Sequence, residues 1–390
     1  MNAANRLVLP VIVLAQFLCT SLWFAGNAIV GDIMGPGHSG LLAHLTSAIQ
    51  FGFITGTLVF ALLTIADRYS PSLVFFVSAL LAAGFNLALT ILHSGTAEIL
   101  ILRFLTGFFL AGIYPVGMKI ASDHTQQGLG KSLGFLVGAL VLGTAFPHAL
   151  KSGTFHLPWK AVLYTTTALA VAGGSAIYLF VPDGPYRKAP QPWRAGAFLE
   201  GFRRPDFRSA AFGYFGHMWE LYTFWASVPL ILRFWANGRA PELSIPGWSF
   251  FVIASGSLAC VASGLLSLRY GAKRIATIAL FGSGLCCLLS PWMLRVGSPY
   301  LFLGFLFLWG TTVIADSPLF STLVARYAPE RSRGTALTIV NSIGFAITIL
   351  SIQFLNAISN LVDTRFLYAF LAIGPLFGLL SLLARRRLNG

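Results

Sequence analysis

The feature that most constrains this chain is a series of long apolar stretches that occupies almost its whole length. Each stretch is close to the roughly 20 residues that a helix needs to cross the ~30 Å hydrocarbon core of a bilayer. The stretches are continuous and lack the alternating pattern of membrane-barrel strands, so helices are predicted. We place twelve spans at approximately 7–30, 44–65, 73–93, 97–118, 132–150, 160–181, 209–232, 247–268, 274–294, 299–324, 334–355 and 365–384.

The charged content favours the same class of protein. Only 10% of the residues are charged, whereas a soluble domain has about 25%. A soluble chain of this composition has too little polar surface to cover its core, so lipid must serve as much of its solvent. The sequence therefore predicts an all-α integral membrane protein with twelve transmembrane helices and the lipid bilayer as a partner.

The formal net charge of +14 invites a nucleic-acid-binding interpretation, which the positions of the charges exclude. Of the 26 Lys and Arg residues, 19 fall on the side of the membrane that holds the N-terminus, 6 fall on the other side, and Arg103 lies inside a span. Basic residues accumulate in cytoplasmic loops. We therefore expect a multi-pass protein of the cytoplasmic (inner) membrane with both termini in the cytoplasm and no nucleic-acid partner.

The longest polar interruption divides the spans into six plus six. We expect a six-helix bundle over 1–181, a cytoplasmic connector over 182–208, and a second six-helix bundle over 209–390. Duplicated bundles are typical of secondary transporters. The sequence thus predicts two pseudo-symmetric halves.

The two halves echo each other in sequence. Arg68-Tyr69 after the second span corresponds to Arg269-Tyr270 after the eighth, at an offset of about 200 residues. Gly130-Lys131-Ser132-Leu133, which enters the fifth span, corresponds to Gly334-Thr335-Ala336-Leu337, which enters the eleventh.

At these positions the chain resembles the major facilitator superfamily over essentially its full length. The family pattern Gly-x-x-x-Asp-Arg-x-Gly after the second span survives in Asp67 and Arg68, whereas Leu63 and Ser70 replace its glycines. The copy after the eighth span retains Gly264, Arg269, Gly271, Lys273 and Arg274, with Leu268 in place of the acid. The resemblance implies the twelve-helix fold of that family, a functional monomer, and a cytoplasmic gate. The gate residues it implies are Asp67, Arg68, Arg269, Lys273 and Arg274, in a latch weakened because each copy is incomplete.

The seventh span carries a carboxylate, Glu220, near the predicted midplane. An ionisable residue at that depth is costly and by default marks a functional site. Burial away from water favours the protonated form of a carboxylate, which suits a proton carrier. His217 lies on the same helix face and is expected to share the proton or to bind the substrate. A structural hydrogen bond to a neighbouring helix is the alternative for both residues.

Asp316 is the third predicted proton-coupling residue and lies beside a proline in the tenth span. Pro318 opens the helical hydrogen-bond ladder, and Ser317 can satisfy the freed carbonyls. We expect Asp316 to face a cavity near the cytoplasmic end of the span, where water reaches it. Capping of a neighbouring helix, or pairing with a loop arginine, is the structural alternative.

Arg103 is the only basic residue well inside a span. It begins the run Arg103-Phe104-Leu105-Thr106-Gly107, which is similar to the fourth-helix pattern of the superfamily. The resemblance implies a role in proton transfer or in binding an anionic substrate. Because Arg103 lies near the outer end of its span, its side chain can alternatively extend to the membrane interface.

Aromatic and amide side chains in the spans are candidates for the lining of a substrate cavity, although interfacial belts and ordinary packing use the same residue types. The predicted substrate-binding residues are Arg103, Glu220, Trp23, Trp219, Tyr222, Gln50 and Asn341.

No cofactor or metal site is predicted. The four cysteines, Cys19, Cys260, Cys286 and Cys287, lie in apolar spans without metal-ligand spacing. We interpret them as small buried hydrophobic residues.

Together these features predict a secondary active transporter that moves a small organic solute by alternating access and couples it to protons. Export by antiport is slightly favoured, because aromatic spans with few fixed charges suit an amphiphilic solute. Arg103 and His148 leave proton-coupled uptake of a small organic anion as the alternative. An intramembrane enzyme is a remote alternative, because the chain has no His-Glu-x-x-His sequence. We therefore do not expect an enzyme.

Overall fold

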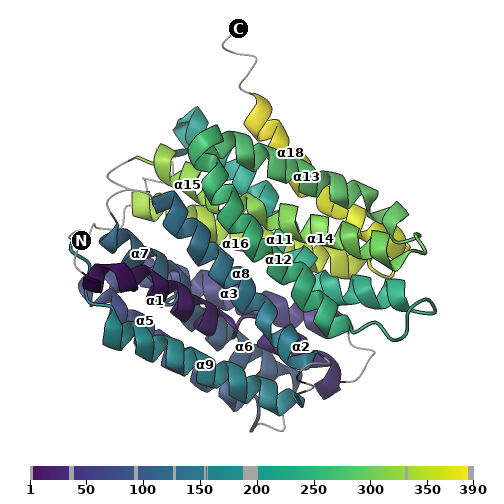
Figure 1. Ribbon diagram of the computed structural model, residues 1–390, viewed down its shortest axis with the longest axis horizontal. Coiled ribbons are helices and arrows are strands. Elements are labelled where there is room, and N and C mark those ends of the chain that lie inside the picture. Colours follow the sequence, from purple (N-terminus) through teal and green to yellow (C-terminus); the bar gives the residue numbers. More distant parts are fainter. Residues whose placement is uncertain are drawn as a thin grey trace. The chain divides into compact units, whose positions relative to one another are not determined.

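The computed structural model describes residues 3–34, 39–91, 95–125, 129–152, 155, 157–187, 201–329 and 333–384. All regular structure in these ranges is helical, and within each half the long helices run side by side (Figure 1). The chain forms two compact units, Met1–Trp193 and Arg194–Gly390. The boundary falls in the predicted connector, of which residues 188–200 lie outside the described ranges.

The first unit contains six predicted spans, two of which are divided into a pair of helices. The first span consists of α1 and α2, and the fourth consists of α6 and α7. The helices are α1 (Ala3–Thr20), α2 (Ala25–Met34), α3 (Ser39–Leu62), α4 (Ile65–Arg68), α5 (Pro71–Ala88), α6 (Thr96–Leu110), α7 (Tyr114–His124), α8 (Leu129–Lys151) and α9 (Trp159–Phe180).

The second unit repeats this plan with breaks in the tenth and twelfth spans. Its helices are α11 (Pro205–Ala236), α12 (Ile245–Tyr270), α13 (Ala272–Met293), α14 (Pro299–Ala315), α15 (Ser317–Tyr327), α16 (Arg333–Ile358), α17 (Thr364–Leu367), the short 3₁₀ helix η2 (Tyr368–Ala372) and α18 (Ile373–Leu383).

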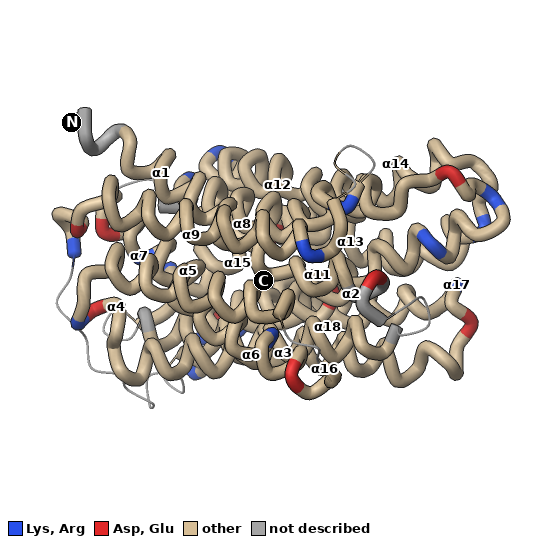
Figure 2. The backbone as a smooth tube through the Cα atoms, turned by 90° about the horizontal axis from the view of Figure 1, so that it is seen from below, with Lys and Arg blue, Asp and Glu red and all other residues tan. Residues whose placement is uncertain are grey.

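Ten helical stretches within the described residues are long and apolar enough to cross a membrane, including Thr96–His124 and Pro299–Tyr327, which run across breaks. The other two predicted spans are also helical. The apolar part of α1 is the shorter stretch Leu7–Thr20, and α11 is a 32-residue helix that contains His217 and Glu220. The predicted all-α membrane fold is confirmed, with ten of the twelve spans identified by length and composition alone. Most of the chain between the helix ends is uncharged (Figure 2).

Local sequence explains where several helices begin. Proline occupies the first turn of α5, α11, α12 and α14, where its missing N–H has no helical acceptor to lose. Ser244 and Ser298 precede α12 and α14, and their hydroxyls accept from the amides of Gly247 and Leu301 at 3.3 and 3.5 Å. Such caps satisfy amides that the first helical turn leaves free.

Close helix crossings position the functional side chains. A Cβ at Gly216 of α11 would overlap the carbonyl oxygen of Gly374 of α18, and a Cβ at Gly374 would overlap that of Gly216. Gly52 of α3 and Gly107 of α6 meet the partner backbone in the same way. Small residues permit such backbone contact between membrane helices. These crossings fix α11, which carries Glu220, and α6, which carries Arg103.

Candidate functional site

The centre of the candidate site is Glu220 of α11, which is only 1% exposed. Its Oε1 accepts a hydrogen bond from Trp309 Nε1 at 2.7 Å and one from Cys287 Sγ at 3.1 Å. Its Oε2 accepts from Ser283 Oγ at 2.8 Å. Three neutral donors from α13 and α14 therefore hold the carboxylate, and within the described residues it has no salt bridge.

The spacing of the donors follows from helix geometry. Ser283 and Cys287 are four residues apart on α13, so they share one face of that helix. Trp309 lies on the next helix, α14. The sequence interpretation assigned no partner to Glu220, and it treated Cys287 as a hydrophobic residue. A serine and a cysteine at helical spacing in an apolar span were the available signal.

One turn before Glu220, His217 faces Asp316. Its Nδ1 lies 2.8 Å from Asp316 Oδ1, and the side chains are 1% and 0% exposed. Asp316 stands between α14 and α15, where its backbone oxygen accepts from the amides of Leu319 and Phe320. This pair connects α11 to the break in the tenth span.

The structure thus brings the three predicted proton-coupling residues into one buried cluster but divides them into two sets of contacts. Glu220 bonds to neutral donors, whereas His217 pairs with Asp316. The expectation that water reaches Asp316 is wrong for this structure, because its side chain is completely buried. Two carboxylates and one imidazole in this setting form a group that can hold and exchange protons.

Arg103 forms a separate site in the first unit. It is fully buried, so the alternative of a side chain that extends to the membrane interface does not occur. Nη1 donates to the carbonyl of Leu22 at 3.2 Å, and Nη2 donates to the carbonyl of Trp23. Both carbonyls lie in the break between α1 and α2, so the guanidinium closes that break. Within the described residues Arg103 has no carboxylate partner.

The other predicted substrate-binding residues are divided between the units. Trp23 packs on Phe53 with ring centroids 4.9 Å apart. Gln50 is completely buried, and its amide atoms have no hydrogen-bond partner among the described residues. Both residues belong to the first unit.

In the second unit the remaining three residues contact the helices around α11. Trp219 Nε1 donates to the carbonyl of Phe370 at 3.4 Å. Tyr222 packs edge-on against Trp225. Asn341 accepts from Tyr214 Oη at 2.8 Å. Trp219 and Tyr222 are themselves residues of α11, and the hydrogen bonds of Glu220 described above go to Ser283, Cys287 and Trp309 instead.

A group of at least three His, Cys, Asp or Glu side chains able to hold a metal ion does not occur in the described part of the chain. The polar cluster around Glu220 is instead composed of donors and titratable groups.

The family model of the Major Facilitator Superfamily matches residues 8–352. The chain belongs to the Major Facilitator Superfamily. It is therefore a multi-pass membrane protein of a transporter family. No curated protein matches it in sequence.

A solved structure shows the same fold. The crystal structure of the human organic anion transporter MFSD10 (TETRAN) has a TM-score of 0.74 and 16% sequence identity, and the match covers 98% of this chain and 100% of that one. At 16% identity the likeness shows a shared fold and does not identify the solute of this superfamily member.

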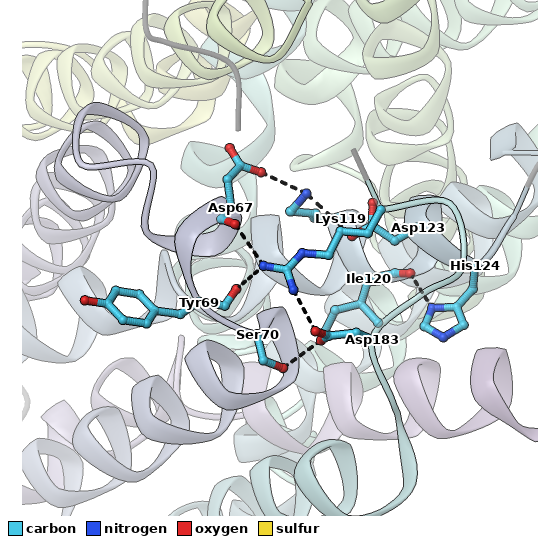
Figure 3. Close-up of polar contacts among 9 residues, drawn as sticks. Asp67, Tyr69, Ser70, Lys119, Ile120, Asp123, His124 and Asp183 are labelled. Carbon is cyan, nitrogen blue, oxygen red and sulfur yellow. Dashed lines mark hydrogen bonds and ion pairs between the residues drawn. The ribbon is translucent and has the colours of Figure 1, made fainter. Parts of the chain in front are cut away.

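The predicted gate residues of the superfamily pattern have unequal contacts. Asp67 pairs with Lys119 of α7 at 2.9 Å, and Lys119 lies 3.5 Å from Asp123 (Figure 3). Arg68 Nε donates to Thr64 Oγ1 at 3.0 Å. In the second copy Arg269 lies over the ring of Tyr270. Lys273 and Arg274 are exposed, and the described residues give neither of them an ion pair.

Arg187 is a further residue of this network that the sequence interpretation missed. Its guanidinium donates to the backbone carbonyls of Asp67 and Tyr69 at 2.8 and 2.7 Å and to Asp183 at 2.6 Å. Ser70 donates to the other oxygen of Asp183, as Figure 3 shows. Arg187 thus binds the loop that carries the Asp67-Arg68 remnant of the family pattern. The spacing of four between Asp183 and Arg187 was the signal in the sequence.

Proposed function

We propose that this superfamily member is a secondary active transporter that moves a small organic solute by alternating access and couples its movement to protons. Export of the solute in exchange for protons is favoured. The observation that supports the proposal is Glu220, a fully buried carboxylate that, among the residues the structure describes, is bonded only to neutral donors. A carboxylate without a fixed cation can lose its charge by taking up a proton, and a salt-bridged one resists this.

The wider arrangement follows the superfamily. In this proposal the bundles 1–181 and 209–390 are the parts that move, and the connector 182–208 joins them. We place the protein in the cytoplasmic (inner) membrane as a functional monomer with both termini in the cytoplasm, since its basic residues concentrate on that side. Members of the superfamily are transporters and generally not enzymes, and no cofactor is invoked.

Arg103 favours a second candidate, proton-coupled uptake of a small organic anion. The buried guanidinium of Arg103 has no carboxylate partner in the described part of the chain, which leaves a positive charge in the first unit. Such a charge would stabilise an anionic solute. The solved relative MFSD10 is described as an organic anion transporter, and the shared fold makes this solute class worth testing first.

The test is proton release from the detergent-purified protein when members of a solute library are added. We expect at least one solute to release protons from the wild type and none from Glu220→Gln. The matched control is Glu242→Gln, which removes an exposed carboxylate from the same unit and should behave as the wild type.

Each outcome separates the candidates. Release from Glu220→Gln equal to that of the wild type would overturn proton exchange at Glu220. Proton uptake with an anionic solute, lost in Arg103→Gln, would replace export by anion uptake. Solute binding without any proton movement would overturn coupling to protons in either direction.

A further inference from the structure

The tenth span meets the seventh through two polar contacts. Trp309, within α14, donates to Glu220 at 2.7 Å. Asp316, at the end of α14, lies 2.8 Å from His217. The two partners on α11 are one helical turn apart, and the two on the tenth span are seven residues apart. The charge state of the α11 residues therefore acts on the tenth span at its middle and at its break.

The three donors to Glu220 differ in donor strength and in whether they have another hydrogen-bond acceptor. Ser283 Oγ also lies 3.2 Å from the carbonyl of Leu280, so its hydroxyl keeps an acceptor within its own helix. The thiol of Cys287 is a weak donor. The indole N–H of Trp309 has Glu220 as its only acceptor among the described residues. Of the three, Trp309 depends most on the carboxylate.

Packing prevents Trp309 from turning easily to another acceptor. Its ring is 1% exposed and lies 4.5 Å from Phe224 and 5.6 Å from Phe305, measured between ring centroids. The next residue, Gly310, approaches the carbonyl of Val252 so closely that a Cβ would overlap it. The indole is thus held by α11 on one side, and its helix is held by α12 on the other.

We propose that Trp309 is a positioning residue for proton exchange at Glu220, and that through it α14 and α15 respond to the charge on this carboxylate. The inference rests on the proposed coupling to protons. The ionised carboxylate accepts a charge-assisted hydrogen bond, which is about twice as strong as a neutral one. Protonation of Glu220 weakens this bond, so α14 is held less firmly to α11 and the chain can bend at the break beside Asp316.

Several titratable groups face this contact. His217 lies on α11 itself, and Asp316 at the α14–α15 junction interacts electrostatically with Glu220. Cys286 and Cys287 on α13 interact electrostatically with Glu220, and Cys260 on α12 does so with Asp316. Tyr368 is the titratable residue of η2. The helix α18 contains no titratable residue, and α16 contains only Arg333, at its first position.

The test is the pH profile of solute-induced proton release in Trp309→Phe, which removes the N–H and retains an aromatic ring. We expect the midpoint of the profile to move upward by about one pH unit, because the ionised form loses a donor. Ser283→Ala should move it less. The matched control is Trp235→Phe, which removes the indole donor of a partly buried acceptor, the carbonyl of Val296 at 2.8 Å, but leaves Glu220 untouched.

A purely structural role for Trp309 predicts a different result. Trp309→Phe and Trp235→Phe would then both lower the thermal stability, with the wild-type midpoint in both, and the inference would be overturned. Proton release that persists in Glu220→Gln would instead overturn the proposed function, so the two failures are distinguishable.

A second measurement does not require the tryptophan variant to fold. Hydrogen–deuterium exchange of the wild type and of Glu220→Gln, both at a pH above the midpoint of wild-type proton release, should differ over residues 299–327. Exchange should be faster in the variant, because its neutral side chain cannot offer the charged acceptor. Peptides of α5 in the other unit serve as the reference. Equal exchange over 299–327 in both proteins would show that the tenth span does not respond to the charge.

Discussion

Arg103 is a buried cation whose partners are backbone carbonyls and whose neighbour is a glycine. A Cβ at Gly26 would lie 2.8 Å from Arg103 Nε, so the guanidinium occupies space that only glycine leaves free. The carbonyls of Leu22 and Trp23 complete its surroundings. Unsatisfied backbone groups in a membrane interior cost several kcal/mol each.

We therefore expect Arg103→Ala to destabilise the protein by about 2–4 kcal/mol, because two carbonyls lose their donor. Arg103→Lys should recover only part of this stability. The ammonium can still donate to a carbonyl, but it lacks the planar fork that reaches both oxygens. Thermal unfolding in detergent, followed by size-exclusion chromatography, ranks the three proteins by stability. Equal stability of all three proteins would contradict a role in closing the helix break.

The contact between His217 and Asp316 leads to a second prediction at this scale. Each single substitution, His217→Ala or Asp316→Ala, leaves a buried polar partner behind, so the double variant should be less destabilised than the sum of the two. Polar pairs within membranes give coupling energies of up to about 1.7 kcal/mol, and we expect about 1 kcal/mol here. The double-mutant cycle is measured by unfolding in detergent. Additive effects would show that the two side chains do not support each other.

The sequence identified Glu220, His217 and Asp316 because an ionisable residue inside an apolar run is visible without a structure. It did not identify their partners. Ser283, Cys287 and Trp309 are 63, 67 and 89 residues from Glu220 in the chain, and ordinary packing residues look the same in a sequence. Which face of α13 meets α11 depends on helix packing that local patterns do not contain.

Among the helices, the breaks were predicted unevenly. Pro318 predicted the break between α14 and α15, because a proline removes a backbone hydrogen bond of the helix. Residues 21–24, between α1 and α2, contain no proline, and the first span was predicted as one continuous helix. The donor that closes this break comes from α6, so the signal lies outside the span itself.

The crossing of α11 and α18 carries a prediction at this scale. Gly216→Ala should destabilise the protein by about 1–3 kcal/mol, because the new methyl group meets the backbone of Gly374, which cannot move aside as a side chain can. Gly304→Ala in α14 is the matched control, since a Cβ there meets nothing within 4 Å. Thermal stability is the measurement. A loss of stability in the control as large as that in Gly216→Ala would contradict this account.

For the whole chain, the repeat of spans is not matched by a repeat of buried charges. Among the described residues, the buried Arg, His, Asp and Glu side chains of the first unit are Arg103, Asp123 and His148, whereas those of the second are Glu220, His217 and Asp316. The order and type of the helices could be read from the apolar runs, which depend only on hydropathy. The sequence also predicts how the charged residues divide between the halves, but it does not predict which of them has an ion-pair partner.

The predicted orientation is testable at this scale. Reporter fusions after Gly238 and after Ala384 should report opposite sides of the membrane, because basic residues concentrate on the side predicted for the C-terminus. The measurement is the activity of a reporter that functions on one side only. The same signal at both positions would contradict the five crossings predicted between Gly238 and Ala384.

The hydrogen bonds from Arg103 also constrain how this protein is made. Trp23 leaves the ribosome 80 residues before Arg103, which at 5–20 residues per second is about 4–16 s earlier. During that interval the first span lacks the hydrogen bonds from Arg103 to the carbonyls of Leu22 and Trp23 in its break. Its final shape is thus a late event of biogenesis, set by the arrival of the fourth span and not by the first span's own insertion.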